Sequence, residues 1–372
     1  MSTIKRVFSR IAAILIILGV SFAACELAVR IVSPQVAGPV QFAYDPKLGA
    51  IPVPNQSARR IAPGIYDYTY SNNSCGLRGI KEYGVNKNPA KFRILLLGDS
   101  STYGIGVNDE ETFAYKIEEE LLREGLKAET INAGNPGKGT DYALRFFQVS
   151  GYKFNPDLTA LCFSKTDFTD NMRSEYYNVT PDRERQLFAK DLSGSIVAKK
   201  RFLKFLPLYN WIITRSHFAN LLKQTAIRVI LTRAEKNTSV PTSSPLVIHY
   251  TVDKDAFPGE RSARLTEIFF KHLKKAVYDS GSDLIVFYIP DSEDVIRYRK
   301  KESVSKGEEV IGDTVRSRNV KFLSLAPVLA ESGKPIELLY YTEGHWTPLG
   351  HSIAAGFMSE HIKKYVEEKV ES

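Results

Sequence analysis

One serine in this sequence follows an apolar run that is typical of a buried strand. The run Ile94–Leu97 is continued by Gly98-Asp99-Ser100. A short unbroken apolar run predicts a strand that is buried on both faces, and open α/β sheets bind their ligands beyond the carboxyl ends of such strands. A hydroxyl at this position is held rigidly and faces a crevice, as a nucleophile requires. A Gly-Asp-Ser sequence alone is also compatible with a plain tight turn, so the assignment of Ser100 as a nucleophile depends on other residues.

A candidate base comes from the far end of the chain. His345 lies in a Gly-His-Trp-Thr-Pro-Leu-Gly-His segment, 245 positions after Ser100. A serine nucleophile needs a base that touches it, a group that orients the base, and hydrogen-bond donors for the oxyanion. A carboxylate on the far ring nitrogen would fix the tautomer of such a base. We expect His351, at the end of the segment, to pack against or cap the start of the last helix.

These distant residues can meet only if the chain forms a parallel sheet. Apolar runs predict further strands, and helical periodicity fills the intervals between them; the predicted strands are 129–132, 158–163, 284–289 and 321–325. This alternation implies right-handed crossovers and a parallel sheet. The strand ends and the turn before the last helix then share one edge. We therefore expect Ser100, Gly137, Thr166 and His345 to converge there.

Two segments depart from this alternation. Residues 31–91 are rich in Pro and Gly and predict an extended arm on the domain, in which Tyr66, Tyr68 and Tyr70 alternate as in a strand. Residues 170–258 predict a mainly helical insertion, whose apolar and basic residues suit packing on the domain, a lid or a membrane-facing surface.

The helix that follows the serine shows a local start signal. Asp109 is the predicted N-cap of this helix, which Gly125 ends. Phe113, Ile117, Leu121 and Leu122 share one face of it, as in a helix that packs on a core.

At the nucleophile the chain resembles the SGNH (GDSL-type) hydrolase superfamily. Gly98, Asp99, Ser100 and Gly104 match its first block. The resemblance implies a flavodoxin-like three-layer α/β sandwich with a mostly parallel five-stranded sheet. It also implies Ser100 as the nucleophile, whose own backbone N–H is an oxyanion donor. The segment that ends at Arg78 and Gly79 looks like the lead-in of bacterial membrane-anchored members.

The other blocks of the superfamily match less completely. Gly137 corresponds to the second block and would give its backbone N–H to the oxyanion, although it could also be a plain turn glycine. Thr166 stands where the third block has Asn, and its hydroxyl is the third candidate donor. The usual acid, three residues before the histidine, is Thr342 here. Some acyltransferase-like members place the acid two residues before it, which implies Glu343 as the partner of His345.

The first residues of the chain predict a targeting segment. Lys5, Arg6 and Arg10 precede 15 uncharged residues that end at Cys25. Positive charge before an apolar run keeps the N-terminus in the cytoplasm. An uncleaved signal anchor over residues 1–30 is the prediction; a cleaved signal peptide and a lipoprotein with lipid on Cys25 are the alternatives. Each of these three targeting segments would export the rest of the chain. We therefore expect the catalytic domain, residues 92–372, to lie outside the cytoplasm.

Composition limits the possible partners. The net charge is +8, but the basic residues are scattered among acidic ones, which favours solubility or an acidic surface over nucleic acid. The three cysteines have no metal-ligand spacing, and we expect neither a metal nor a cofactor. Cys75 and Cys162 could pair in an oxidising compartment, although Cys162 also suits a small core residue.

We therefore expect an exported SGNH-like serine esterase or O-acyltransferase, tethered to a bacterial inner membrane. Its expected substrates are ester groups, chiefly acetyl groups on cell-envelope or exported carbohydrate. One alternative is a degenerate carbohydrate-binding or assembly module without activity, which Thr166 and Thr342 motivate. The other is a lysophospholipase-like lipid esterase, which the apolar residues after Phe202 motivate.

Overall fold

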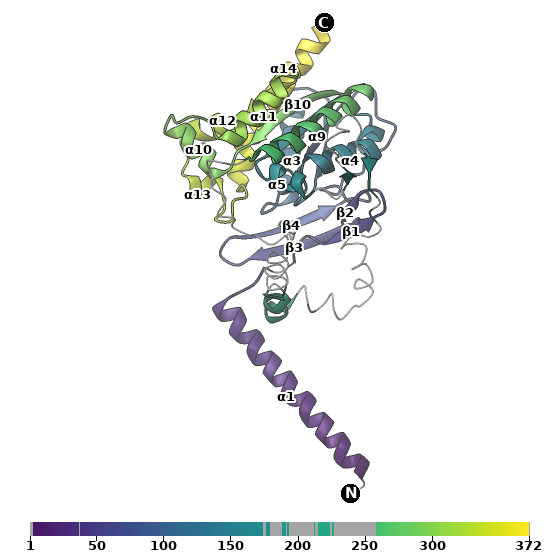
Figure 1. Ribbon diagram of the computed structural model, residues 1–372, viewed down its shortest axis with the longest axis vertical. Coiled ribbons are helices and arrows are strands. Elements are labelled where there is room, and N and C mark those ends of the chain that lie inside the picture. Colours follow the sequence, from purple (N-terminus) through teal and green to yellow (C-terminus); the bar gives the residue numbers. More distant parts are fainter. Residues whose placement is uncertain are drawn as a thin grey trace. The chain divides into compact units, whose positions relative to one another are not determined.

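The computed structural model forms two compact units (Figure 1). It describes residues 3–36, 38–173, 176–178, 188–190, 192, 212, 215–223, 225–226 and 258–371. One unit contains residues 1–39, 60–64 and 202–247, and the other contains residues 40–59, 65–201 and 248–372. Most of the predicted insertion at 170–258 lies outside the described residues. Of the large apolar residues after Phe202, only Ile212, Phe218, Leu221 and Leu222 are described.

The larger unit is built on a five-stranded parallel sheet of order β11-β10-β7-β5-β6. The strands are β5 Phe92–Gly98, β6 Ala128–Gly134, β7 Leu158–Ser164, β10 Asp283–Ile289 and β11 Lys321–Ser324. The register pairs Gly98 with Gly134 and Cys162, so neighbouring strands end at one edge. The predicted parallel sheet is confirmed, and its strand ends meet as expected.

Helices cover both faces of this sheet and complete a three-layer sandwich (Figure 1). One apolar core lies under α4 Thr140–Val149, α5 Thr166–Met172, α9 Glu260–Asp279 and α11 Lys306–Arg316. The other lies under α3 Phe113–Arg123, α10 Ser292–Arg299, α12 Ala326–Glu331, α13 Ile336–Leu339 and α14 Pro348–Glu371. Alternate residues of β5 enter the two cores, as period-two side-chain geometry requires: Leu95 and Leu97 enter the first, Ile94 and Leu96 the second.

Short elements complete the unit. The nucleophile block forms α2 Ser100–Tyr103, and 3₁₀ turns lie at η1 Asp109–Glu111 and η2 Gly151–Phe154. Two-stranded sheets are formed by β1 Phe42–Asp45 with β2 Gly49–Pro52, by β3 Gln56–Ala62 with β4 Tyr66–Asn72, and by β8 Tyr177–Asn178 with β9 Phe188–Ala189. The alternating tyrosines do lie in a strand, because Tyr66, Tyr68 and Tyr70 are buried on one face of β4.

Three local predictions need comment. On the predicted inner face of α3, Phe113, Ile117 and Leu121 are buried, but Leu122 is 49% exposed and does not belong to it. Thr112, not Asp109, is the N-cap of α3, because the Thr112 hydroxyl accepts a hydrogen bond from the backbone N–H of Tyr115. Asp109 begins the 3₁₀ turn instead, and its carboxylate accepts from Arg78. Cys75 and Cys162 are both free; Cys162 is buried in β7, whereas Cys75 is exposed.

The smaller unit contains the helix α1 Thr3–Val32, whose residues Arg6–Val32 are long and apolar enough to cross a membrane. Within this unit the carboxylate of Glu26 accepts hydrogen bonds from the Ser216 hydroxyl and from the backbone N–H groups of His217 and Phe218. It also pairs with Arg30, one turn later in α1, at 2.7 Å. Glu26, the acidic residue in the apolar segment, is therefore fully engaged with polar partners.

Candidate active site

The candidate nucleophile sits in a sharp strand-to-helix turn. Asp99 follows β5 and caps α2, because its carboxylate accepts from the backbone N–H of Ser101 at 2.8 Å. Ser100 is the first residue of α2, so its backbone N–H has no partner inside that helix. The turn therefore presents, from the same residue, a hydroxyl and an amide that no carbonyl of the helix accepts.

The candidate base meets this serine. His345 Nε2 lies 2.8 Å from Ser100 Oγ, and His345 Nδ1 lies 2.5 Å from Glu343 Oε2. Since the carboxylate can only accept at Nδ1, the ring proton belongs there, and Nε2 is left to accept the serine proton. The three side chains therefore form a continuous chain of hydrogen bonds from carboxylate to hydroxyl.

A tight turn holds the histidine and its carboxylate together. The backbone N–H of Tyr341 donates to the carbonyl of His345 at 2.8 Å, and the N–H of Gly344 donates to the carbonyl of Tyr341 at 2.9 Å. Glu343 reaches back inside this turn to the imidazole, whereas Thr342, at the usual acid position, is exposed. Glu343 is the residue that contacts the histidine.

Gly137 lies three residues beyond the end of β6, and Gly134 of that strand pairs with Gly98. Its φ of 72° lies in the left-handed region, where a side chain would be strained, while a Cβ would meet nothing within 4 Å. Glycine is required here by backbone conformation and not by crowding. Within the described part of the chain, no hydrogen bond engages its backbone N–H.

The Thr166 hydroxyl already has partners. Thr166 Oγ1 donates to Asp99 Oδ2 at 2.8 Å and lies 2.6 Å from Ser164 Oγ, which also donates to Asp99 Oδ2 at 2.7 Å. A hydroxyl has one proton, so a proton shared with Asp99 is not at the same time available to an oxyanion. Thr166 can act as an oxyanion donor only after its hydroxyl rotates away from Asp99.

Two more carboxyl groups lie beside Asp99: Asp167 is buried, and the side chain of Asp170 is 16% exposed. Burial, and then the neighbouring Asp99 carboxylate, raises the pKa of Asp167 well above its usual range. The same two causes raise the pKa of Asp170 to about 7. Hydrogen bonds from the Thr140 hydroxyl and the Ser164 N–H oppose the shift at Asp167. Asp99 and its neighbours thus place several acidic groups on the α5 side of the site.

The remaining conspicuous histidine has a packing role. His351 is buried, stacks on Phe113 and accepts the Phe113 backbone N–H at Nδ1. Burial lowers its pKa to about 3, so the ring is neutral. As expected, it packs at the start of the last helix. Among the described residues, no group of three His, Cys, Asp or Glu side chains could hold a metal ion.

The sequence reasoning missed three residues around the site. Asp99 was seen only as part of a motif, yet its carboxylate caps α2 and accepts two hydroxyls. Arg78 donates to the backbone just after α2, and the Tyr341 hydroxyl donates to Gly106. The resemblance of the segment ending at Arg78 and Gly79 to a family lead-in was the one available signal for Arg78.

No family model and no curated protein matches the chain. Solved structures similar to it include the esterase EstA from Pseudoalteromonas sp., with 12% identity over 74% of this chain and 99% of that one and a TM-score of 0.40. An acetyl xylan esterase gives 13% identity over 73% and 99%, with a TM-score of 0.40. A GDSL-like lipase from Bacteroides thetaiotaomicron gives 10% identity over 74% and 89%, with a TM-score of 0.36. The solved structures to which the chain is similar are thus described as esterases and as a GDSL-like lipase.

Proposed function

We propose that this protein is an SGNH-type serine esterase or O-acyltransferase with Ser100 as nucleophile, His345 as base and Glu343 as the orienting acid. The observation that carries this proposal is the continuous chain of hydrogen bonds from Glu343 through His345 to Ser100, 2.5 and 2.8 Å long. A surface histidine without catalytic duty has no need of a carboxylate on one nitrogen and a serine on the other.

The reaction follows from this geometry. His345 Nε2 takes the proton of Ser100 Oγ as the oxygen attacks the ester carbonyl. The backbone N–H groups of Ser100 and Gly137 stabilise the oxyanion, with Thr166 as the third candidate donor. Collapse expels the alcohol, which receives the proton from His345 and leaves an acyl group on Ser100. Water or a sugar hydroxyl then gives its proton to His345 and takes the acyl group, restoring the serine.

The proposed setting is the outer side of a bacterial inner membrane, with α1 as the anchor and acetyl esters of envelope or exported carbohydrate as substrates. The length and apolar character of Arg6–Val32 support the anchor. The resemblance of the sequence motifs supports the substrate class. The rival interpretation as a binding module without activity differs from this proposal in one respect, the reactivity of Ser100.

The deciding experiment measures p-nitrophenol release from p-nitrophenyl acetate by the full chain in detergent. Ser100→Ala should lower kcat by about 1000-fold or more, because loss of a triad nucleophile removes the acyl-enzyme route. Ser101→Ala, which removes the adjacent hydroxyl, is the matched control and should keep most of the activity. Equal rates for wild type and Ser100→Ala would remove the nucleophile assignment.

A second measurement separates the rival functions. Stoichiometric labelling of Ser100 by a fluorophosphonate argues against a binding module without activity. Turnover of long-chain lipid esters in preference to acetyl esters would favour the lipid esterase over the carbohydrate esterase.

A further inference from the structure

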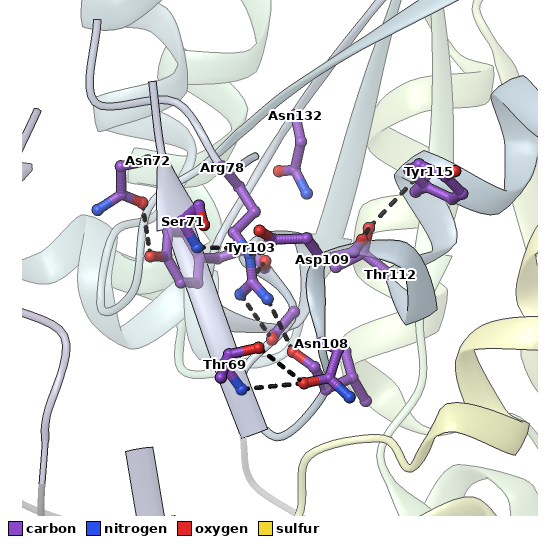
Figure 2. A network of polar contacts seen from close by, with 12 residues as sticks. Thr69, Ser71, Asn72, Arg78, Tyr103, Asn108, Asp109, Thr112, Tyr115 and Asn132 are labelled. Atoms are coloured by element: carbon purple, nitrogen blue, oxygen red, sulfur yellow. Dashed lines mark hydrogen bonds and ion pairs between the residues drawn. The ribbon is translucent and has the colours of Figure 1, made fainter. Parts of the chain in front are cut away.

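A buried arginine holds the backbone that follows the nucleophile helix (Figure 2). The side chain of Arg78 is 1% exposed. Its Nη1 donates to the carbonyls of Tyr103 and Gly104 at 3.1 and 3.0 Å, and its Nη2 donates to the carbonyl of Val107 at 2.7 Å. Its Nε donates to Asp109 Oδ1 at 2.6 Å, which balances the buried charge. We call residues 103–109, which begin at the last residue of α2, the post-nucleophile loop.

Holding this loop also holds Ser100. The α2 helix spans only Ser100–Tyr103, about one turn, and its last carbonyls have no partner within the helix. Arg78 satisfies the carbonyl of Tyr103 and that of the C-cap residue Gly104. A shift of the loop therefore moves the other end of the same turn, where the Ser100 hydroxyl lies.

A row of tyrosines on β4 connects the nucleophile helix to the histidine turn. The ring of Tyr70 lies 6.3 Å from that of Tyr103 in α2, and the ring of Tyr66 lies 5.5 Å from that of Tyr341. Tyr68 lies between them, 5.4 Å from Tyr66 and 6.2 Å from Tyr70. The Arg78 guanidinium lies 4.9 Å from the Tyr103 ring centroid. One face of β4 thus contacts the segments that carry the two reacting side chains.

The histidine turn also contacts the post-nucleophile loop directly. The Tyr341 hydroxyl donates to the carbonyl of Gly106 at 3.0 Å, and a Cβ on Gly106 would lie 2.7 Å from the Tyr341 ring. The Tyr341 backbone N–H donates to the carbonyl of His345. Tyr341 therefore joins the histidine to the same loop that Arg78 fixes on the serine side.

From these contacts we propose that Arg78 and Tyr341 are positioning residues that set the separation between Ser100 Oγ and His345 Nε2. Neither residue touches the reacting atoms; each acts through the post-nucleophile loop. The inference rests on the proposed function, since it concerns how the serine is activated. Because a displacement of about 1 Å can cost on the order of 100-fold in rate, modest relaxation of the loop is enough to matter.

The test compares variants by the rate of fluorophosphonate labelling of Ser100 per folded molecule and by kcat and KM on p-nitrophenyl acetate. Arg78→Ala and Arg78→Lys should lower the labelling rate and kcat about 10- to 100-fold, with KM changed less than about threefold. Lysine keeps the charge but cannot present the fork of donors that three carbonyls require. Arg59→Ala is the matched control, because Arg59 is an exposed arginine on β3 that pairs with Asp67 of β4. It should label at the wild-type rate.

Chemical rescue separates positioning from a purely structural role. Arg78 lines a surface pocket of about 430 Å³ together with Asp109, Thr112 and Asn132, so a small cation has a path to the vacated position. Non-denaturing guanidinium chloride should restore part of the Arg78→Ala labelling rate, whereas sodium chloride at equal concentration should not. A folded Arg78→Ala protein that labels as fast as wild type overturns the inference.

If the Arg78 variants do not fold, Tyr341→Phe tests whether the post-nucleophile loop positions Ser100 and His345. It keeps the ring contact with Tyr66 and loses only the hydrogen bond to the Gly106 carbonyl. We expect about 10-fold slower labelling at unchanged KM, and an unchanged labelling rate overturns the inference. Failure of wild-type Ser100 to label would instead overturn the proposed function, so the two failures are distinguishable.

Discussion

At the scale of single residues, the histidine and its acid are unusually close in sequence. Glu343 precedes His345 by two positions, and the carboxylate still reaches the imidazole at 2.5 Å because the tight turn folds the side chain back. The longer glutamate side chain allows this reach. Its second oxygen, Oε1, has no hydrogen-bond partner among the described residues. The contact with His345 is therefore the principal polar contact of this carboxylate.

Replacing this acid should therefore impair catalysis without unfolding the protein. We expect Glu343→Gln to lower kcat by about 100- to 10,000-fold, because an amide cannot stabilise the imidazolium and permits the wrong tautomer. Thr342→Ala is the control at the neighbouring exposed position and should lose little activity. Steady-state hydrolysis of p-nitrophenyl acetate measures both. Full activity in Glu343→Gln, or an equal loss in Thr342→Ala, would contradict the assignment.

At the scale of elements, α5 brings buried acidic groups to the site. It carries Asp167 and Asp170, and the pKa of each is raised by burial and then by Asp99. A carboxyl group whose pKa is higher in the folded than in the unfolded state binds its proton more tightly when folded. Its contribution to stability is therefore greatest at low pH and is lost as pH rises from about 4, its unfolded pKa, through its folded pKa.

This argument predicts that the free energy of unfolding depends on pH and that one substitution weakens this dependence. For wild type, the Asp170 contribution to the free energy of unfolding should fall between about pH 4 and about pH 7, because the pKa of Asp170 is raised from its unfolded value to about 7. Asp170→Asn should gain stability relative to wild type at the higher pH, by a few kcal/mol at most. Urea unfolding of the detergent-solubilised chain measures this. Asp313→Asn, at an exposed position on α11, is the control. If Asp170→Asn showed the same dependence of stability on pH as wild type, the raised pKa of Asp170 would be contradicted.

At the scale of the whole molecule, the proposed anchor helix would set where the site can act. Residues Arg6–Val32 number 27, which at 1.5 Å per residue is about 40 Å and exceeds the roughly 30 Å of a hydrocarbon core. The uncharged run of 15 residues is at the short end for a span, but the helix continues beyond Glu26 to Val32. The basic residues before the apolar segment predict a cytoplasmic N-terminus and an exported catalytic unit.

One exposed thiol allows the orientation to be measured. Cys75 is exposed, whereas Cys162 is buried. In a Cys25→Ser background, a membrane-impermeant maleimide should label the chain in intact bacterial spheroplasts, because export leaves Cys75 outside the membrane. The same chain with Cys75→Ser should not be labelled. Labelling that requires lysis would place the catalytic unit in the cytoplasm and contradict the predicted export.

The amino-acid pattern alone is enough to predict the sheet and most of its strands. The runs of β5, β7 and β10 were predicted to within about two residues because strands buried on both faces are continuous apolar segments with clear ends. The strand β4 was predicted from a different local pattern, the alternation of its tyrosines, which is typical of a strand buried on one face. The N-cap of α3 was assigned wrongly to Asp109, because either Asp109 or Thr112 can cap and only the tertiary partner Arg78 of Asp109 decides between them.

Which side chains are in contact at the site can be seen only in the tertiary structure. Ser100 and His345 are 245 positions apart, and the contacts of Arg78 with the post-nucleophile loop span 25 to 31 positions. The Thr166 hydroxyl turns to Asp99, a partner in a different strand-end turn. Periodicity and local motifs report the neighbours of a residue along the chain. Hydrogen bonds at this site join residues that only the packing of the sheet and its loops brings together, and no local pattern encodes those distances.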